Sequence, residues 1–511
     1  MGIRRSRIYW LLGPGVALLL LLLVSIGAVA STSGASPGAA KAHRLAAQPN
    51  IIVIESDDQP TIAFNHHAMP KTFRRVVDHG TVFPQMVATP PLCCPSRAAL
   101  MTGDYPHNSG VWSNKPGYRD LEGKGDVLPV WLHRAGYRTA LEGKFLNGYG
   151  SFAGDEPPPG WDHVMRPIDP YRYFGTPFWR DGRHVRLPPN GYITDAETHD
   201  AVGYLRSNLG AKQPIFMWYT PTAPHNGTPP TPPCDHWDPV PKAADYERFA
   251  NAALPKSPNY NEPDVSDKPP GLQRPPLTPQ QQARILQRYR CALGSLWSVD
   301  QGVKAIVDEL QAAGELRNTL LIYTSDNGMM YGEHRFSSGK EKPYEESTRV
   351  PLAVRPPRTT AAPPHTSSAP VGMVDLAPTI LDYARAAPCS ASGCRRLDGR
   401  SLRPLLEGRS RRWPADRGLL IELNADCAYE GIRTTSAVYV EYETPPGGNC
   451  PGPGVRELYD LSRDPFQLHN LLVEEPQSPE TKALRKSMAA RLDRLEVCSG
   501  TAGSRGTVPC E

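Results

Sequence analysis

The chain has 511 residues, of which 56 are basic and 52 are acidic, so its formal net charge is only +4. This balance gives no reason to expect binding of nucleic acid through bulk charge, and the length suffices for a sizeable core and more than one domain. The 56 prolines favour long ordered loops over disorder, because apolar runs recur along the chain. Ten cysteines are too few for a disulfide scaffold.

The N-terminus has the pattern of an export signal. A basic start, MGIRRSRIYW, precedes a long apolar stretch, and Ala28-Val29-Ala30 before Ser31 fits a small-residue cleavage site. We therefore expect a signal peptide at residues 1–30, a flexible linker at 31–48 and a secreted or extracytoplasmic protein. An uncleaved membrane anchor is the alternative, since the apolar stretch is long enough to span a bilayer.

An exported chain can keep disulfides, because it folds away from the reducing cytoplasm. Three pairs of cysteines are close enough in sequence to be linked: Cys389 with Cys394, Cys427 with Cys450, and Cys498 with Cys510. We expect these three disulfides on spacing alone.

The folded part begins with alternating strands and helices. A short β-branched run at residues 51–54 is typical of a buried parallel strand, and Asp57 and Asp58 follow it. Next, a helix that closes near Gly136 leads into a strand that ends before Lys144. Each of these strands therefore delivers polar side chains at its carboxyl end.

The pattern continues further along the chain. The apolar run PIFMWY predicts another buried strand, which ends before His225. Thr278 as cap and Pro279 as first residue predict a long helix, in which apolar residues return at helical spacing: Leu286, Tyr289, Leu293, Leu296, Val303 and Ile306. The run NTLLIY then predicts a strand that ends before Asp326 and Asn327.

This order indicates an α/β fold with a large, mainly parallel sheet flanked by helices. We assign the catalytic domain to residues 49–388, with a proline-rich insertion at 226–276 that shapes the substrate site. Residues 389–511 read as a smaller C-terminal α+β subdomain, with a helix near 478–497 and short strands at GLLIEL, SAVYVEYE and RELYDL. Ligands of such sheets bind beyond the carboxyl ends of the strands, where the polar residues gather.

Two oxygen-rich pairs suggest a metal site. Asp57-Asp58 and Asp326-Asn327 both follow predicted strands, although nearly 270 residues separate them. Four oxygen ligands suit Ca²⁺ or Mg²⁺ better than a softer metal. Either pair alone is more often a cap of a helix or a turn, and the matching positions favour the metal.

The stretch LCCPSRAALMTG, residues 92–103, resembles the start of a helix. Pro95 fits the first turn, so Cys93 and Cys94 are expected just before the helix, where its dipole favours an anion and lowers a thiol pKa. Arg97, one turn on, can hold an oxyanion. A disulfide or a buried thiol is the plain alternative. A cysteine hydrolase is the rival functional interpretation, but it would leave the acidic pairs unused.

The motif CCPSRAALMTG resembles the signature of the formylglycine-dependent sulfatases, which belong to the alkaline phosphatase superfamily. Other segments that resemble the family follow in the family's order: IIVIESDDQ, EGKFLNGYG, TPTAPH, YTSDNG, GEHRFSSGKEKPYEESTRVPL, VDLAPTILDYA and ELYDLSRDPFQLHNLL. The resemblance covers most of the chain after residue 49. It implies that a separate generating enzyme oxidises Cys93 to Cα-formylglycine, and that Cys94 occupies a variable position.

The resemblance also implies roles residue by residue. One Ca²⁺ is held by Asp57, Asp58, Asp326, Asn327 and an oxygen on the modified Cys93. Arg97 and Lys144 hold the formylglycine hydroxyls, and His225 and Lys340 contact the sulfate or the leaving oxygen. His334, in GEHR, is given no catalytic role.

One position departs from the family. Many sulfatases have a histidine two or three residues after the lysine that matches Lys144, whereas this chain has Asn147. An amide cannot exchange a proton at neutral pH, so the base that acts on the diol is left open. The CCPSR form with GKFLNGYG is most similar to the N-acetylglucosamine-6-sulfatase and extracellular heparan-sulfatase branch, which implies a sulfated carbohydrate substrate.

Four alternatives remain beside a sugar sulfatase. The chain could hydrolyse aryl sulfates, or phosphoesters or phosphonates, since these esters share shape and metal needs. It could be a silent protein that binds sulfated glycans if Cys93 is not converted. It could also be a cysteine hydrolase with an unmodified thiolate.

Overall fold

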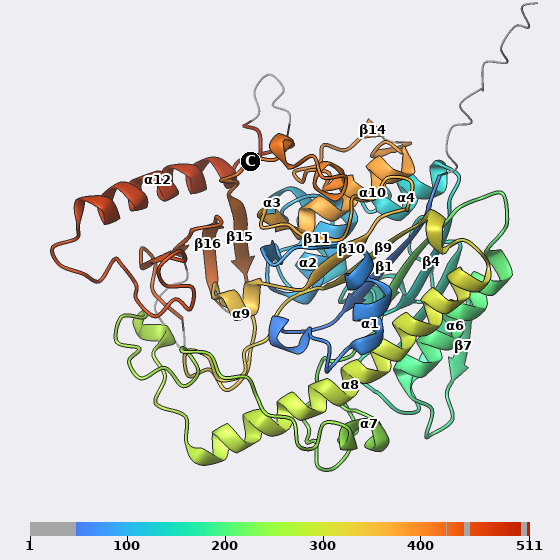
Figure 1. The fold of residues 1–511 in the computed structure, drawn as a ribbon, viewed down its shortest axis with the longest axis horizontal. Helices are drawn as coiled ribbons and strands as arrows, with labels where there is room; N and C mark the ends of the chain where they lie inside the picture. The colour runs from blue at the N-terminus through green and yellow to red at the C-terminus, as the bar shows by residue number, and fades with distance from the viewer. Residues whose placement is uncertain (1–47, 392, 426, 444–449, 502–507) are drawn as a thin grey trace, which may run out of the picture. The chain divides into compact units, whose positions relative to one another are not determined.

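The core of the protein is a ten-stranded sheet, seen near the centre of Figure 1. The structure is a computed structural model, and it describes residues 48–511 except 392, 426, 444–449 and 502–507. The strands are β1 (Asn50–Ser56), β2 (Thr81–Val82), β4 (Arg138–Gly143), β5 (His163–Pro167), β6 (Pro177–Arg180), β7 (Arg183–Arg186), β8 (Ile215–Thr220), β9 (Thr319–Ser325), β10 (Leu352–Arg355) and β11 (His365–Thr366). Their order is β11-β2-β10-β9-β1-β8-β4-β5-β6-β7.

The central strands β9, β1, β8, β4 and β5 are parallel, which confirms the predicted fold class. Every residue of β1, β8 and β9 is buried, as expected for strands covered on both faces. In the register, Ser56 at the end of β1 pairs with Ser325 at the end of β9. The polar residues that follow these two strands therefore meet at one edge of the sheet. Beyond the parallel centre, β10, β6 and β7 run antiparallel to their neighbours.

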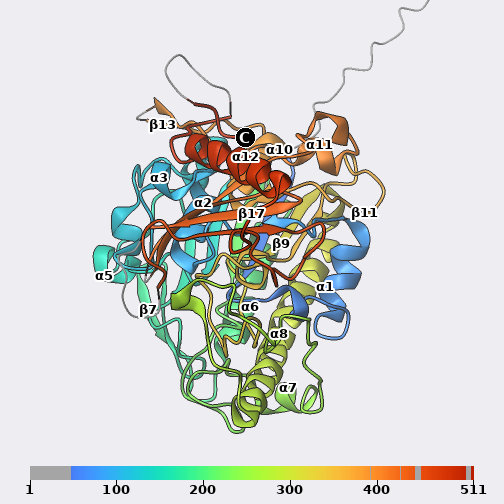
Figure 2. The ribbon, with the colours of Figure 1, turned by 90° about the vertical axis from the view of Figure 1, so that its left-hand side faces the viewer.

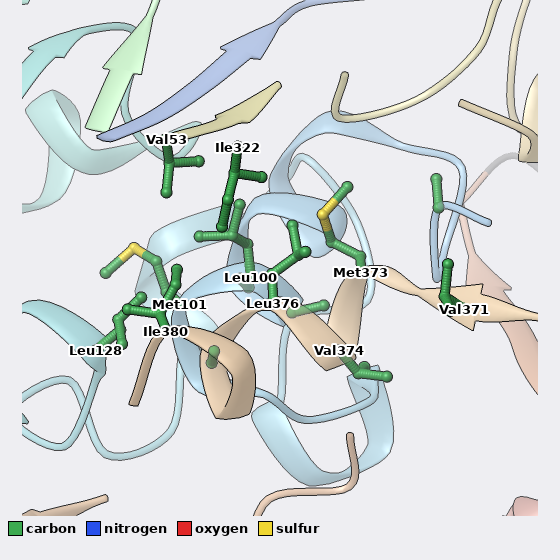
Figure 3. Packing of buried hydrophobic residues seen from close by; sticks show 14 of the residues in the cluster. Val53, Leu100, Met101, Leu128, Ile322, Val371, Met373, Val374, Leu376 and Ile380 are labelled. Atoms are coloured by element: carbon green, nitrogen blue, oxygen red, sulfur yellow. The ribbon is translucent and has the colours of Figure 1, made fainter. Parts of the chain in front are cut away.

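Helices cover both faces of the sheet. On one face, α1 (Pro70–Arg75), α6 (Ile193–Asn208) and α8 (Pro279–Ala312) pack on Ile52 and Ile54 of β1. On the other face, Ile51 and Val53 share one hydrophobic cluster with residues of α2 (Cys93–Thr102), α4 (Leu128–Arg134) and α10 (Leu376–Ala384). The short helix α3 (Pro106–Ser109) contacts α2. Figure 3 shows this second layer, with Val53 and Ile322 above Leu100 of α2 and Leu376 of α10.

The long helix α8 begins as the sequence predicts. The hydroxyl of Thr278 accepts a hydrogen bond from Gln281 N, and the Gln281 side chain accepts one from Thr278 N, which completes a capping box. Several further helices are short. They are α5 (Tyr149–Ala153), α7 (Ala243–Glu247), α9 (Glu345–Thr348), α11 (Arg403–Leu406) and the 3₁₀ turns Thr61–Ala63, Val77–His79, Gly117–Asp120, Pro270–Leu272, Leu316–Asn318, Met373–Asp375 and Ser410–Arg412.

The C-terminal part forms a second, antiparallel sheet of β15 (Leu419–Asn424), β16 (Ala428–Arg433), β17 (Ala437–Tyr442) and β18 (Arg456–Asp460). The helix α12 (Pro479–Leu495) packs on β16 and β17, as Figure 2 shows. The sequence predicts three of these strands and the helix but not β16. Small two-stranded pairs complete the fold: β3 (Met86–Val87) with β12 (Val371–Gly372), and β13 (Cys389–Ser390) with β14 (Gly393–Cys394).

The described residues belong to one unit, Ala47–Glu511. Buried ion pairs join the C-terminal sheet to the rest of the fold: Arg417 Nη1 lies 2.6 Å from Asp375 Oδ2, and Arg433 Nη2 lies 3.0 Å from Glu345 Oε2. The domain boundary expected near residue 388 stays a prediction. The expected signal peptide and almost all of the linker lie outside the described residues.

All three expected disulfides form, namely Cys389–Cys394, Cys427–Cys450 and Cys498–Cys510. A fourth, Cys234–Cys291, links residues 57 positions apart and was not expected from spacing. Cys93 and Cys94 stay free in the part of the chain that the structure describes, and both are buried. No helix in the described ranges is both long and apolar enough to cross a membrane.

Candidate active site

The two acidic pairs meet at the carboxyl ends of β1 and β9. Asp58 N donates to Asp326 Oδ1 at 3.1 Å, and Asn327 Nδ2 donates to Asp58 Oδ1 at 2.7 Å. Asp57, Asp58, Asp326 and Asn327 are all buried. Asp58 has a φ of +63°, a conformation that non-glycine residues rarely adopt. The fold therefore brings together four oxygen-bearing side chains from segments far apart in sequence.

The two adjacent cysteines lie in different surroundings. Cys93 Sγ lies 3.6 Å from Asp57 Oδ1 and 2.8 Å from Lys340 Nζ, so it belongs to the acidic cluster. Cys94 Sγ lies 3.8 Å from Asn147 O, and its side chain is part of the hydrophobic core. The geometry therefore selects Cys93 as the thiol that faces the polar site.

Two expectations about these cysteines are wrong. Helix α2 includes them, because Ser96 N already donates to Leu92 O at 3.0 Å and Leu92 is the extended cap. Their thiol pKa values are raised rather than lowered, to about 12 for Cys94. Burial is the main cause, and for Cys93 the neighbouring Asp57 carboxylate adds to it. A thiolate nucleophile is therefore disfavoured in the unmodified protein.

The buried guanidinium of Arg97 links several groups of the site. Its Nε donates to Asp326 Oδ2 at 2.9 Å, its Nη1 to Lys144 O at 3.0 Å and its Nη2 to Asp57 Oδ2 at 3.4 Å. Glu55 lies under the same guanidinium, with Oε2 3.5 Å from Nη1. Burial raises the pKa of Glu55 to about 8 although Arg97 opposes the shift. Sequence reasoning missed Glu55, whose signal is an acidic residue inside an otherwise apolar strand.

Two lysines neutralise the acidic pair. Lys144, just after β4, is ion-paired with Asp57, and Lys340 is ion-paired with Asp58. Burial alone would raise the pKa of each aspartate, but Lys144 beside Asp57 and Lys340 beside Asp58 hold both pKa values below the ordinary range. Both carboxylates are therefore ionised at neutral pH.

His225 completes the polar cluster. Its Nδ1 lies 2.7 Å from Asn226 O, and since a carbonyl only accepts, Nδ1 carries the proton. Its Nε2 lies 3.5 Å from Asp58 Oδ2 and faces the site. Burial lowers the pKa of His225, despite the attraction of Asp58 and Asp57. The ring therefore presents a fixed Nε2 to whatever binds here.

The oxygen atoms of this cluster fit a hard divalent cation. Asp58 Oδ2 and Asn327 Oδ1 are buried without a hydrogen-bond partner, which is costly unless a ligand uses them. Ligand atoms of Asp57, Asp58, Cys93 and His225 all lie within 4.8 Å of one another. Carboxylate and amide oxygens are the ligands that Ca²⁺ prefers, and Asp326 adds another carboxylate.

Asn147, the departure from the family pattern, lies beside the cluster. Its Nδ2 donates to the hydroxyl of Tyr171 at 3.1 Å, and its Oδ1 is buried without a partner. The Tyr171 ring lies 5.3 Å from Lys144 Nζ and 4.8 Å from the His225 ring. No sequence motif marks Tyr171. His334 lies apart, bonded to Glu262 Oε2 at 2.6 Å.

Two cavities reach this cluster. One, of about 450 Å³, is lined by Asp58, His225 and Lys340 together with the loop residue Trp237 and with Arg284 and Arg288 of α8. The other, of about 430 Å³, is lined by Lys144, Asn147 and Tyr171 and by residues of the α5 region. Both volumes lie within the usual range of ligand-binding pockets. The polar site is therefore open to a ligand of the size of a sugar.

The fold and the cluster together define a class of α/β proteins that gather buried carboxylates, lysines, an arginine and a histidine at the carboxyl edge of a mainly parallel sheet. The chain belongs to the sulfatase family, whose family model matches residues 49–386. Both the family and the fold class expected from the sequence are confirmed.

Individual relatives refine this picture. An arylsulfatase of Volvox carteri is 35% identical over 398 residues, which cover 71% of this chain and 59% of the relative. The chain thus spans less than two thirds of that relative's length. Human N-acetylglucosamine-6-sulfatase is 28% identical over 94% of this chain and 89% of its own. The structure of BT4656 with its substrate D-glucosamine-2-N,6-O-disulfate has a TM-score of 0.69 and 25% identity, covering 87% of this chain and 97% of BT4656.

Proposed function

We propose that this protein is a sulfuric ester hydrolase that cleaves sulfate monoesters on sugars, with Cys93 converted to Cα-formylglycine. The observation that carries the proposal is the position of Cys93. Its Sγ lies between Lys340 Nζ, at 2.8 Å, and Asp57 Oδ1, at 3.6 Å, whereas Cys94 is turned into the core. A nucleophile at this position would attack a sulfate group whose negative charge is balanced by the ammonium groups of Lys144 and Lys340.

Two groups absent from the sequence itself supply part of the chemistry. Hydrated formylglycine offers one hydroxyl as a nucleophile for sulfur and a second that releases the sulfate without attack by water. A bound Ca²⁺ neutralises sulfate oxygens and lowers the pKa of a nearby hydroxyl. Its ligands would be Asp57, Asp58, Asp326 and Asn327, together with an oxygen on modified Cys93.

The chain's own residues then divide the remaining work. Arg97 fixes the carboxylates of Asp57 and Asp326 in position. Lys144 and Lys340 are the donors for the formylglycine hydroxyls and for the sulfate oxygens, since both ammonium groups border the cluster. His225 Nε2 faces the same space, and Asn226 O holds a proton on Nδ1, so in the neutral ring Nε2 is an acceptor. When both ring nitrogens carry a proton, Nε2 can deliver one to the leaving oxygen.

The substrate proposal is a 6-O-sulfated N-acetylglucosamine unit. The human relative with that name aligns with 94% of this chain, and the BT4656 structure contains a sulfated glucosamine. The cavity beside His225 is bordered by the 226–276 insertion, which supplies Asn226, Trp237 and Pro239 to its wall. An aryl sulfate is the second candidate, because the Volvox arylsulfatase has the higher identity.

We also propose that the protein is exported through residues 1–30 and meets its formylglycine-generating enzyme during maturation. Extracellular sulfatases among the relatives and the four disulfides support an oxidising compartment. Sequencing the N-terminus of secreted protein tests this, with a start near Ser31 expected. An intact N-terminus in a membrane fraction would contradict it.

The decisive experiment compares ester classes with protein whose Cys93 peptide shows the formylglycine mass. Sulfate release from N-acetylglucosamine-6-sulfate, an aryl sulfate, and matched phosphate and phosphonate esters is measured and divided by the uncatalysed rates. Cys93→Ala should abolish turnover, and Cys94→Ala should retain it.

Each outcome separates the alternatives. Turnover of aryl sulfates alone would contradict the proposed sugar substrate and would leave the proposed sulfatase activity intact. Turnover of phosphonates alone would favour the other hydrolases of the superfamily. Binding of sulfated glycans without turnover would favour the silent binding protein, and activity that survives exhaustive chelation would favour the cysteine hydrolase.

A further inference from the structure

Trp237 is the most exposed of the large hydrophobic side chains among the described residues, with 72% of its surface accessible. It lies on the wall of the cavity that also contains Asp58, His225 and Lys340. Scattered exposed apolar residues are ordinary, but an exposed indole at the mouth of a polar site is not accounted for by folding. Its position therefore calls for a ligand-based explanation.

The backbone under Trp237 is firmly fixed. Residues 235–238 form a turn in which Asp238 N donates to Asp235 O at 3.0 Å and Asp235 N donates to Asp238 Oδ2 at 2.9 Å. The buried Asp238 is ion-paired with Arg284 at 2.9 Å and with Arg288 at 3.3 Å, both on α8. The turn is therefore held against the long helix by one buried carboxylate.

A covalent link adds a second attachment. The disulfide Cys234–Cys291 joins the residue before the turn to the same helix α8. By contrast, none of the ring–ring or cation–ring contacts within the described ranges involves Trp237, whereas Trp297 of α8 lies under Arg248 at 4.5 Å. The fold thus fixes the loop but leaves the indole face uncovered.

We propose that Trp237 is the platform on which the pyranose ring of the substrate stacks while its sulfate occupies the site at Asp58, His225 and Lys340. The apolar C–H face of a sugar packs well on an aromatic face, and its hydroxyls need polar partners around the rim. The same cavity offers such partners in Asn226, Arg284 and Ser338. Its volume of about 450 Å³ suits one or two sugar units.

This inference rests on the proposed function and specifies the residue that recognises the sugar. A long apolar ligand is disfavoured, because Arg284, Arg288 and the carboxylate of Asp58 line the same cavity as the indole. The platform acts on substrate binding rather than on the reacting atoms. It should therefore affect KM more than kcat.

The test is Trp237→Ala in the formylglycine-bearing enzyme, assayed with N-acetylglucosamine-6-sulfate. We expect kcat/KM to fall about tenfold, mainly through KM, since loss of one aromatic stack costs a factor of this order. Trp237→Phe should recover most of the loss, because it keeps an aromatic face. The inhibition constant of inorganic sulfate should stay unchanged, since sulfate has no ring to stack.

Val497→Ala is the control, because Val497 is an exposed hydrophobic residue, 65% accessible, outside the residues that line either cavity. It should leave kcat/KM unchanged. If wild-type enzyme turns over the sugar sulfate and Trp237→Ala does so equally well, the platform is wrong while the proposed function stands. If inorganic sulfate binds more weakly too, Trp237 acts on the site's structure and the platform is also wrong. If wild-type enzyme turns over no sulfated sugar, the proposed substrate fails and the platform fails with it.

Discussion

Arg97 is the residue on which the geometry of the site depends most. Three of its nitrogens reach Asp326, Asp57 and the Lys144 carbonyl in different directions. A lysine offers a single point charge and cannot reproduce this planar fork. Loss of these contacts would leave buried carboxylates without their partner.

We therefore predict that Arg97→Lys lowers kcat/KM at least about 100-fold, because the misplaced carboxylates no longer form the site, and destabilises the protein by about 3 kcal/mol. Urea unfolding and steady-state kinetics check this. Arg403→Lys is the control, since Arg403 is partly exposed and pairs with Glu407 and Asp382 near the surface, where each such pair contributes less than about 1 kcal/mol. Equal effects of the two substitutions would contradict the prediction.

Asn327 tests the cation site without relying on turnover. Its Oδ1 is buried and has no hydrogen-bond partner, so the proposed Ca²⁺ is its natural partner. We predict that Asn327→Ala weakens Ca²⁺ binding at least about tenfold, as measured by calorimetric titration of chelator-treated protein. Asn65→Ala, which removes an amide that closes a turn elsewhere, should not change it. Unchanged affinity in Asn327→Ala would remove this residue from the ligand set.

At this scale the sequence is informative where a side chain follows a strand or belongs to a motif. Strand ends predict that Asp57 and Asp326 meet, and the structure brings them to one cluster through Arg97. The pKa prediction for Cys93 is wrong because a helix terminus favours a thiolate only where solvent or cations outweigh burial. Tyr171 and Trp237 could not be predicted, since no local pattern marks a residue that a loop brings to the site.

At the scale of elements, His163 of β5 joins three segments. Its Nδ1 lies 2.7 Å from Asp181 Oδ2, and its Nε2 lies 2.9 Å from Asp200 Oδ2 of α6 and 3.2 Å from Glu142 Oε1 of β4. Arg180 also contacts Asp200. Burial would lower the pKa of His163, but the hydrogen bonds to Asp181 and Asp200 and the nearby carboxylate of Glu142 raise it to about 11.

This predicts a stability that depends on pH. The pKa of a histidine in the unfolded chain is about 6.5. When the pKa is higher in the folded chain, the charged histidine stabilises the fold by its full amount at pH values below about 6.5. The contribution declines as pH rises towards the folded pKa of about 11. His163→Gln should therefore cost about 3 kcal/mol near pH 6 and clearly less at pH 10.

Urea unfolding of wild type and His163→Gln at both pH values measures the difference. His184→Gln is the control, because His184 forms an exposed pair with Asp155 and should change stability by less than about 0.5 kcal/mol. A difference between wild type and His163→Gln that grows between pH 6 and pH 10 would contradict the assignment of an imidazolium at this junction.

The prediction of elements from sequence succeeds in the middle of the sheet and fails at its ends. Strands such as β8 are apolar throughout and carry a strong signal because helices cover both faces. By contrast, β7 (Arg183–Arg186) is fully exposed and contains three basic residues, so its pattern indicates a loop. Pairing with β6 across a two-residue turn, not burial, forms this strand.

At the scale of the whole molecule, the disulfides close loops of very different length. Cys234–Cys291 spans 57 residues and attaches the insertion to α8, whereas Cys389–Cys394 spans only 5 and closes a local hairpin. Since the entropy lost by the unfolded chain grows with the length of the closed loop, the two links should differ in their effect. The chain-entropy estimate is about 4 kcal/mol for the longer loop and about 2 kcal/mol for the shorter one.

We therefore predict that Cys234→Ala/Cys291→Ala lowers the free energy of unfolding by about 4 kcal/mol, and Cys389→Ala/Cys394→Ala by about 2 kcal/mol. Urea unfolding of oxidised proteins measures both. The first variant should also weaken binding of the sugar substrate, because it frees the turn that carries Trp237. Binding of inorganic sulfate should not change. The second variant is the control for kinetics, since neither Cys389 nor Cys394 lines the cavity beside His225. A larger loss of stability on removing the short-loop disulfide would contradict the chain-entropy estimate. Equal kinetics for both variants would show that the insertion holds its position without the Cys234–Cys291 disulfide.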